Sequence, residues 1–143
     1  WIEELNLAVK KKEIPLLGIC LGMQLLAERG YEVRKCNGLG YIEGEIVRFM
    51  PSEMNERIPH VGWNNIEKNL EIPLLDGIPD NTNFYFVHSY YFKALREENI
   101  AAVTPYCGEF PSIVVKDNIV GTQFHPEKSQ KAGFKVIKNF LRM

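Results

Sequence analysis

The chain has 143 residues, of which 45% are hydrophobic and 24% charged, a composition typical of globular domains rather than of disordered, collagen-like or membrane proteins. Its 17 Lys and Arg residues against 18 Asp and Glu give a net charge of −1, so we expect neither nucleic acid nor a membrane surface as a partner. The three cysteines form no CxxC pair, which speaks against a disulfide framework or a zinc site and favours a reducing, cytoplasmic setting.

The first thirty residues predict a helix, a strand, a tight turn and a second helix. Near-helical spacing over residues 2–12 predicts a surface helix whose buried stripe consists of Ile2, Leu5 and Val9. Pro15 ends this pattern, and the continuous apolar run 14–19 is typical of a parallel strand covered on both faces. Helical composition resumes over residues 23–29. The apolar run over residues 14–27 is too short and too interrupted to span a membrane.

The rest of the chain predicts short strands and one final helix. Extended segments are expected at residues 42–49, 84–91, 100–104, 112–116 and 119–124. Asp117-Asn118 predicts a hairpin turn, and residues 131–141 carry apolar side chains at helical steps, among them Phe134, Ile137 and Leu141. We therefore predict one α/β domain over residues 1–143, with a mixed, mostly parallel sheet flanked by helices.

Cys20 lies where the predicted strand meets the predicted helix, in the pentapeptide Gly18-Ile19-Cys20-Leu21-Gly22. G-x-C-x-G at such a turn is the cysteine version of the nucleophile elbow, because glycines allow the close packing that holds the strained turn. The following helix would lower the pKa of the thiol toward 7 or below, and the Leu21 N–H would face a developing oxyanion. A small buried cysteine between packing glycines is an equally open interpretation.

His125 ends an apolar strand and precedes Pro126, which forces the chain out of the sheet. Glu127 is close enough in sequence to accept a hydrogen bond from the imidazole and to fix its tautomer. A thiol nucleophile needs such a base with an orienting partner, so Cys20, His125 and Glu127 are a candidate catalytic triad. A strand-end histidine beside a solvated carboxylate remains the alternative. His60 and His88 have no acidic partner at short range.

The segments 18–24 and 124–127 resemble, in full and in the expected order, the nucleophile and His–Glu motifs of class I (triad) glutamine amidotransferases. Within that class, the segments 59–64, 85–90 and 125–129 look like the glutaminase subunits of imidazole glycerol phosphate synthases. This resemblance implies hydrolysis of glutamine by Cys20 and His125, without a metal or an organic cofactor. It also implies that Gln24, and the backbone around Ser89 and Tyr90, help to hold the glutamine.

The same resemblance implies a heterodimer with a cyclase subunit that receives the ammonia for histidine biosynthesis. The segment 59–64 is then a loop on the partner surface, to which the resemblance assigns Pro59, His60, Gly62, Trp63, Asn64 and Lys128. An aromatic residue flanked by His, Gly and Asn is an ordinary turn about as often, although Trp is enriched at binding hot spots.

One part of the family pattern has no counterpart in these 143 residues. Relatives begin with further strand–helix units and a glycine-rich loop that supplies a second oxyanion donor, so we expect this chain to be the C-terminal part of a longer protein and weakly active or inactive alone. Losing one such donor typically costs ~10²–10³ in turnover. Two alternatives stay open: a related glutaminase that delivers ammonia for amino- or amidino-sugar synthesis, and a docking module whose triad is silent. A cysteine peptidase is disfavoured by Gln24 and the segment 59–64.

Overall fold

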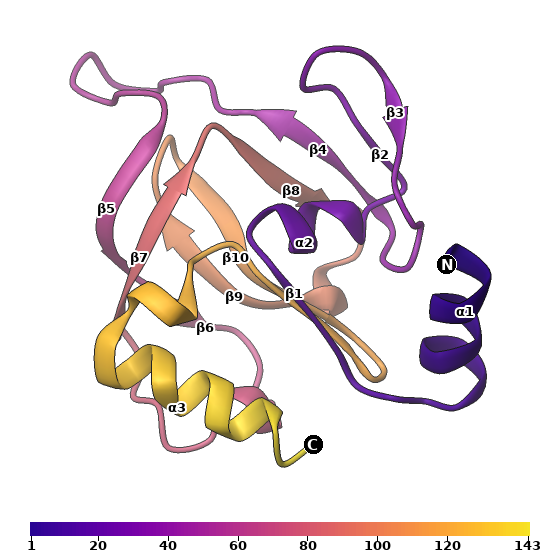
Figure 1. The fold of residues 1–143 in the computed structure, drawn as a ribbon. Helices are drawn as coiled ribbons and strands as arrows, with labels where there is room; N and C mark the ends of the chain where they lie inside the picture. The colour runs from indigo at the N-terminus through magenta and orange to yellow at the C-terminus, as the bar shows by residue number, and fades with distance from the viewer.

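The computed structural model describes residues 1–143 and contains three sheets with three short helices around them (Figure 1). The largest sheet has the strand order β1-β11-β10-β9-β6, with bounds β1 Leu16–Ile19, β11 Ile119–Thr122, β10 Glu109–Lys116, β9 Ile100–Pro105 and β6 Glu67–Lys68. Strand β1 pairs with β11 in parallel, and the other pairs of this sheet are antiparallel. Strand β1 therefore forms one edge of the sheet.

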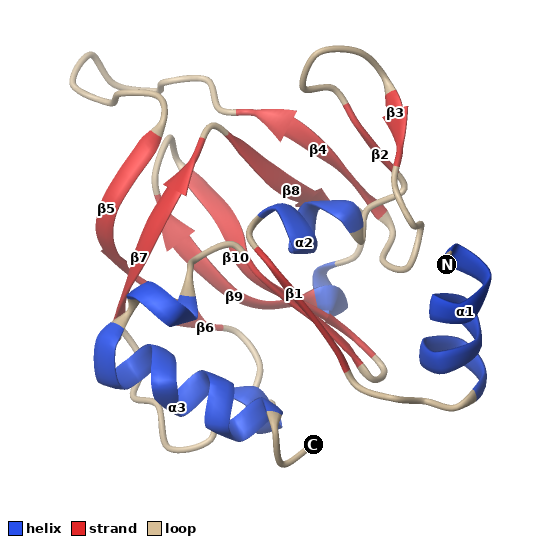
Figure 2. Ribbon diagram, viewed as in Figure 1, coloured by secondary structure: helices blue, strands red, loops and turns tan.

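Two smaller sheets complete the β structure. The first has the order β3-β2-β4-β8, with bounds β3 Cys36–Asn37, β2 Arg29–Gly30, β4 Gly44–Arg48 and β8 Tyr90–Ala94. The second pairs β5 (His60–Asn65) with β7 (Asn83–His88) in antiparallel fashion. Figure 2 shows how β7 and β8 meet at a corner, so that one continuous stretch of chain serves both sheets.

The helices cover the outside of the sheets (Figure 2). Helix α1 (Ile2–Asn6) continues as a π-helical turn η1 (Leu7–Lys11), α2 (Leu21–Leu25) follows β1, and α3 (Gln130–Phe140) ends the chain. Three 3₁₀ turns complete the fold: η2 Pro73–Leu75, η3 Glu97–Asn99 and η4 Pro126–Lys128. No helix is both long and apolar enough to cross a bilayer.

Two apolar clusters form the core. The larger one is rich in aromatic rings and includes Phe84, Phe86, Phe110 and Phe124, of which Phe84 and Phe124 stack with their ring centres 4.1 Å apart. The smaller one joins α2 to the sheets through Met23, Leu26 and Phe92. Leu17 of β1 packs against the larger cluster and Leu16 against the smaller one, so close-packed apolar side chains support the strand that leads to Cys20.

The α/β class and most predicted elements are confirmed, including the helix over residues 2–11, the final helix and the hairpin turn at Asp117-Asn118. The expected mostly parallel sheet is wrong, since only β1–β11 and β2–β4 pair in parallel. Apolar patterning reveals that a segment is a strand, but the connections decide its direction, and several of these are hairpins.

Some boundaries and faces also differ from the predictions. The helix expected over 23–29 begins at Leu21 and ends at Leu25, and Arg29 lies in β2. The segment 84–91 divides at Ser89 into β7 and β8, because the chain changes sheets there. Phe134 is exposed, since α3 packs through Gly133, Val136 and Asn139, and Ile2 is exposed on α1.

Candidate active site

The nucleophile turn has the strained backbone that the sequence predicts. Cys20 adopts φ 50° and ψ −105°, a conformation that is costly for a residue with a side chain. A Cβ at Gly18 would lie 2.7 Å from the Gly22 backbone, so only glycine fits there. A Cβ at Gly22 would meet nothing within 4 Å, and the expected packing requirement therefore holds for the first glycine alone.

The Cys20 thiol lies half-buried among polar groups. The Gln123 side-chain amide donates to its Sγ at 3.6 Å, and the Val87 carbonyl oxygen lies 3.9 Å from it. Burial raises the pKa of Cys20 above its ordinary value, and the opposing hydrogen bonds from the Leu21 N–H and from Gln123 do not reverse this. The prediction of a lowered thiol pKa is therefore wrong: α2 has only five residues, and desolvation outweighs its N–H groups.

His125 is paired with Glu127 as predicted. Its Nδ1 lies 2.7 Å from Glu127 Oε1, which fixes the tautomer because only a ring N–H can donate to a carboxylate. The other ring nitrogen, Nε2, makes no hydrogen bond to the chain and is left as an acceptor. An imidazole held in this way is equipped to take up a proton at Nε2.

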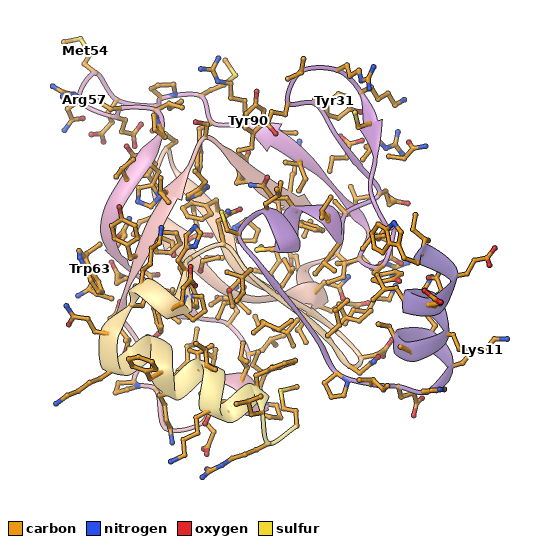
Figure 3. The ribbon with its side chains drawn as sticks, viewed as in Figure 1. Lys11, Tyr31, Met54, Arg57, Trp63 and Tyr90 are labelled. Carbon is orange, nitrogen blue, oxygen red and sulfur yellow. The ribbon has the colours of Figure 1, made fainter.

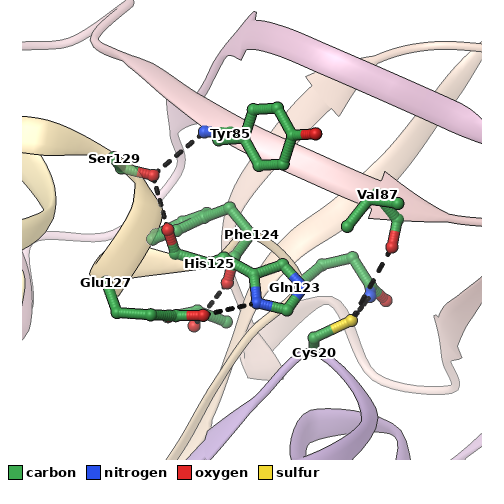
Figure 4. A network of polar contacts seen from close by, with 9 residues as sticks. Cys20, Tyr85, Val87, Gln123, Phe124, His125, Glu127 and Ser129 are labelled. Atoms are coloured by element: carbon green, nitrogen blue, oxygen red, sulfur yellow. Dashed lines mark hydrogen bonds and ion pairs between the residues drawn. The ribbon is translucent and has the colours of Figure 1, made fainter.

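The backbone around His125 is linked to β7 both directly and through Ser129, and Figure 4 shows the two hydrogen bonds of the Ser129 hydroxyl. The His125 N–H donates to the Tyr85 carbonyl at 2.9 Å, the Ser129 hydroxyl donates to the His125 carbonyl at 2.7 Å, and the Tyr85 N–H donates to the Ser129 oxygen at 3.0 Å. Ser129 is 1% exposed. The imidazole is thus carried by the sheet and not by a free loop.

Strand pairing brings the two motifs to the same end of the sheet. Ile19 on β1 is the register partner of Thr122 on β11, and the Cys20 N–H donates to the Thr122 carbonyl at 2.7 Å. His125 follows Thr122 by three residues. Figure 4 shows the imidazole and the thiol presented on the same side of this sheet end, with Gln123 behind the sulfur.

A cavity of about 250 Å³ opens beside the nucleophile turn, and Leu21, Gln24, Tyr31, Glu32, Arg34 and Cys36 are among its lining residues. Gln24 donates to the Tyr90 carbonyl at 3.1 Å and lies 3.3 Å from Gln123 Oε1. The Tyr90 hydroxyl, labelled in Figure 3, donates to the backbone carbonyl of the lining residue Glu32 at 2.8 Å.

The carbonyl groups of Ser89 and Tyr90 already have partners within the chain. The Ser89 carbonyl accepts the Phe49 N–H at 3.1 Å, and the Tyr90 carbonyl accepts from both Gln24 and His88. The sequence did not single out Gln123 or Glu32. The position of Gln123 next to the His–Glu motif could have pointed to it, whereas no feature of the local sequence points to Glu32.

The segment 59–64 is not the loop that the sequence predicts, since His60–Asn65 is the strand β5. Strand alternation turns Val61 and Trp63 outward, 56% and 49% exposed, and turns His60 inward, only 4% exposed. Trp63 projects from the molecular surface in Figure 3. Pro59 and Lys128 are also exposed, and Gly62 and Asn64 are half-buried. The expectation that His60 faces a partner is therefore wrong, because its ring lies in the interior.

The described chain contains no group of three or more His, Cys, Asp or Glu side chains arranged to hold a metal ion. At the end of β1 the chain brings together a thiol, an imidazole and a carboxylate, next to a cavity with both apolar and polar lining residues.

A family model of class-I glutamine amidotransferases matches residues 2–143, and the chain belongs to this family. Two solved structures of glutamine amidotransferases share the fold: one from Thermotoga maritima, with a TM-score of 0.63 and 24% identity, and a second with a TM-score of 0.70 and 20% identity. This chain covers 52% and 66% of those chains, and they cover 97% and 99% of it.

Within the family, the chain is similar to one particular kind of protein. It is 49% identical over 143 residues to imidazole glycerol phosphate synthase subunit HisH 1 of Campylobacter jejuni, which corresponds to 100% of this chain and 70% of that protein. It is also 49% identical over 144 residues to imidazole glycerol phosphate synthase subunit HisH of Brucella abortus, over 99% of this chain and 67% of the relative. The chain thus spans about two-thirds of these relatives.

Proposed function

We propose that this chain carries the glutaminase site of an imidazole glycerol phosphate synthase, which releases ammonia from glutamine for a partner cyclase subunit in histidine biosynthesis. One observation carries the proposal: His125, oriented by Glu127 at 2.7 Å, keeps Nε2 free at the same sheet end as the Cys20 thiol. The 49% identity to two synthase subunits supports the same reaction and the same partner.

In the proposed reaction, the Cys20 sulfur attacks the side-chain amide carbon of glutamine, and His125 Nε2 takes the thiol proton. Because burial raises the pKa of Cys20, the proposed attack needs such a base to take up the thiol proton. The C–N bond then breaks, His125 returns the proton to the departing ammonia, and a γ-glutamyl thioester remains. Water, deprotonated by His125, attacks the thioester, and glutamate leaves as the thiol is restored.

The Leu21 N–H and the cavity beside the nucleophile turn would assist this reaction. The Leu21 N–H, already hydrogen-bonded toward the sulfur, would donate to the oxyanion of each tetrahedral intermediate. The cavity beside the turn would hold the rest of the glutamine, with Gln24 as a hydrogen-bonding wall. Its Glu32 carboxylate and Arg34 guanidinium match the opposite charges of the α-ammonium and α-carboxylate groups.

The outward face of β5 is the proposed surface for the cyclase. Trp63 is 49% exposed and packs edge-to-face on Tyr85 with ring centres 6.1 Å apart, which holds a large apolar group at the surface. Pro59, Gly62 and Asn64 from β5 and its approach, and Lys128 after His125, would border this contact. The same strand thus bears the proposed docking residue outside and buried polar side chains inside.

The test is covalent trapping with a diazoketone analogue of glutamine, followed by peptide-resolved mass spectrometry. We expect the reagent to label Cys20, to label it far more slowly in His125→Ala, and to be displaced by excess glutamine. Cys36 and Cys107 serve as internal controls, because they lie outside the proposed triad. Equal labelling of all three cysteines, or labelling of Cys20 that is indifferent to His125, would contradict a glutaminase site.

A further inference from the structure

The two remaining histidines form a buried hydrogen-bonded pair. His60 on β5 and His88 on β7 are register partners, with His60 Nδ1 3.0 Å from His88 Nε2. They are 4% and 6% exposed. The proposed reaction uses neither ring. Although neither histidine has an acidic partner, the aromatic rings and hydrogen bonds around them hold both imidazoles in one orientation.

A cage of aromatic rings holds the pair in place. His60 is sandwiched between Tyr106 and Phe86, with ring centres 3.9 Å and 5.0 Å away and nearly parallel planes. Phe110 packs on both imidazoles, 5.8 Å from His60 and 5.0 Å from His88. Burial lowers the pKa of each histidine to about 4, so both rings are neutral at physiological pH. A neutral ring has one donor and one acceptor, which makes its hydrogen bonds directional.

The direction of the hydrogen bonds follows from one carbonyl. His88 Nδ1 lies 2.8 Å from the Tyr90 carbonyl oxygen, which can only accept, so the hydrogen of His88 is on Nδ1 and its Nε2 is an acceptor. His60 must therefore donate from Nδ1, and its Nε2 becomes an acceptor as well. Asn64 Nδ2 lies 3.3 Å from that nitrogen and supplies the donor.

Two further contacts of Asn64 agree with this direction. Its amide nitrogen also donates to the Pro105 carbonyl at 3.0 Å, and its Oδ1 accepts the Asn65 N–H at 2.9 Å. The nitrogen must therefore face His60, whatever the histidines require. Gly62 lies between His60 and Asn64 with φ 130°, and β5 is visibly bowed (Figure 1), which brings two side chains four residues apart into contact.

On the other side of the Tyr90 carbonyl, the hydrogen bonds lead to the nucleophile. Gln24 Nε2 donates to the same oxygen at 3.1 Å and to Gln123 Oε1 at 3.3 Å. Gln123 must then direct its NH₂ group away from Gln24, and its Nε2 donates to Cys20 Sγ at 3.6 Å. Gln24 Oε1 has no donor within the chain and is free to accept a hydrogen bond from a ligand in the cavity.

From this arrangement we propose that His60, His88 and Asn64 are positioning residues of the nucleophile site, acting through the Tyr90 carbonyl on Gln24 and Gln123. The inference rests on the proposed glutaminase function for its meaning in catalysis. Asn64, His60 and His88 form a chain of hydrogen bonds that ends at the Tyr90 carbonyl oxygen. The same oxygen accepts from Gln24, and Gln24 in turn orients Gln123, which donates to the Cys20 sulfur. The strand that bears Trp63 outside is thereby connected to Cys20 inside.

The principal variant is Asn64→Asp, because a carboxylate cannot donate to His60 Nε2. Either His60 takes up a proton inside its aromatic cage, or both rings exchange tautomers and a lone pair of His88 faces the Tyr90 carbonyl. In both cases the carbonyl and Gln24 move. Asn65→Asp is the matched control, since it places the same charge one residue away on the same strand, where the side chain donates to Asn81 and not to His60.

The first measurement is the pH dependence of Cys20 alkylation by iodoacetamide, resolved by peptide mass spectrometry, which requires no turnover. Loss of the Gln123 donor favours the neutral thiol, so Asn64→Asp should move the midpoint upward by about 0.5–1 pH unit. Asn65→Asp should leave it in place, and Gln123→Met should show the same upward shift. The second measurement is glutamine hydrolysis, where we expect the KM of Asn64→Asp to rise roughly tenfold, the size of one lost hydrogen bond.

A second pair of variants separates positioning from mere packing. His88→Asn keeps a donor near the place of Nδ1, whereas His88→Gln keeps a polar group near the place of Nε2 and removes the donor to Tyr90. Both variants remove the ring, so a purely structural role predicts equal alkylation profiles. We expect His88→Gln to show the larger upward shift. Equal profiles for this pair, or for Asn64→Asp and Asn65→Asp, would overturn the proposal.

The unmodified protein provides a test that is independent of any variant. The ¹⁵N shifts of its histidine rings should show His60 and His88 both neutral with the hydrogen on Nδ1. A ring of either residue with its hydrogen on Nε2 contradicts the deduced direction. These spectra and the alkylation profiles stand even if the glutamine analogue fails to label Cys20, so failure of the proposed function and failure of this inference can be told apart.

Discussion

The three histidines of this chain occupy two contrasting surroundings. His125 has a side chain that is 19% exposed, one ring nitrogen bonded to Glu127 and the other free. His60 and His88 are almost fully buried, and all four of their ring nitrogens face a hydrogen-bond partner. A ring with a free nitrogen can exchange a proton with a substrate, whereas a ring with both nitrogens occupied can only hold its neighbours in place.

The two surroundings also place different chemical groups next to the imidazole rings. Glu127 gives His125 an anionic partner 2.7 Å away, which would stabilise an imidazolium in the proposed reaction. The aromatic cage around His60 and His88 does the opposite, since burial lowers the pKa of both to about 4 and keeps them neutral. The imidazole with the proposed catalytic role thus faces a carboxylate, whereas the two proposed positioning imidazoles are enclosed by aromatic rings.

The largest expected effect comes from removing the free nitrogen. His125→Asn takes away the only imidazole proposed to touch the reacting atoms, and general-base catalysis contributes typically ~10²–10⁴ in rate. We expect glutamate formation to fall by about that factor while the midpoint of thermal unfolding changes little, because His125 is partly exposed. An enzymatic glutamate assay and a melting curve measure the two quantities. A turnover within a few-fold of the parent would erase the distinction between the two kinds of histidine.

Local chemistry explains why the sequence predicts the reactive half of the site. The Gly18–Gly22 turn, and the strand end before Pro126, are features of adjacent residues, so Cys20, His125 and Glu127 are visible without knowing the fold. The sign of the Cys20 pKa shift was not visible, because it depends on burial by distant segments. The fold class also followed from local patterns, whereas strand direction, which depends on the connections, did not.

The supporting half of the site depends on register. His60 and His88 are 28 positions apart and meet only because β5 pairs with β7 in one antiparallel register. Since the segment 59–64 gave the signals of a loop, its alternation of inward and outward side chains was not expected. Gln123 meets Gln24 across 99 positions, and no short-range pattern marks such a pair.

The second expected effect concerns the stability of the fold at acidic pH. His60 and His88 have folded-state pKa values of about 4, below the ordinary value of 6.5, so only the unfolded chain takes up their protons between these limits. Their contribution to stability is therefore present above pH 6.5 and is lost as the pH falls toward 4. At pH 5 we expect a loss on the order of 2 kcal/mol per histidine relative to pH 7.

Urea unfolding at pH 7 and pH 5 measures this loss. The double variant His60→Gln/His88→Gln is the control, because its amides do not titrate and should flatten the pH dependence even though they lower the stability at pH 7. His125→Asn should retain most of the pH dependence of the parent. An equal loss in the parent and in the double variant would mean that the buried pair does not cause it.

The smallest expected effect on the chain itself comes from the outward face of β5. Trp63→Ala removes a half-exposed ring that packs edge-to-face on Tyr85, at a stability cost of about 0.5–1.5 kcal/mol, and touches none of the hydrogen bonds that lead from Asn64 to Cys20. With a cyclase partner present, we expect glutamate still to form while a smaller share of the ammonia reaches the aminated product. The ratio of the two products measures this share. An unchanged ratio would remove Trp63 from the proposed docking surface, whereas a shifted alkylation profile of Cys20 would show that the outer and inner faces of β5 are not independent.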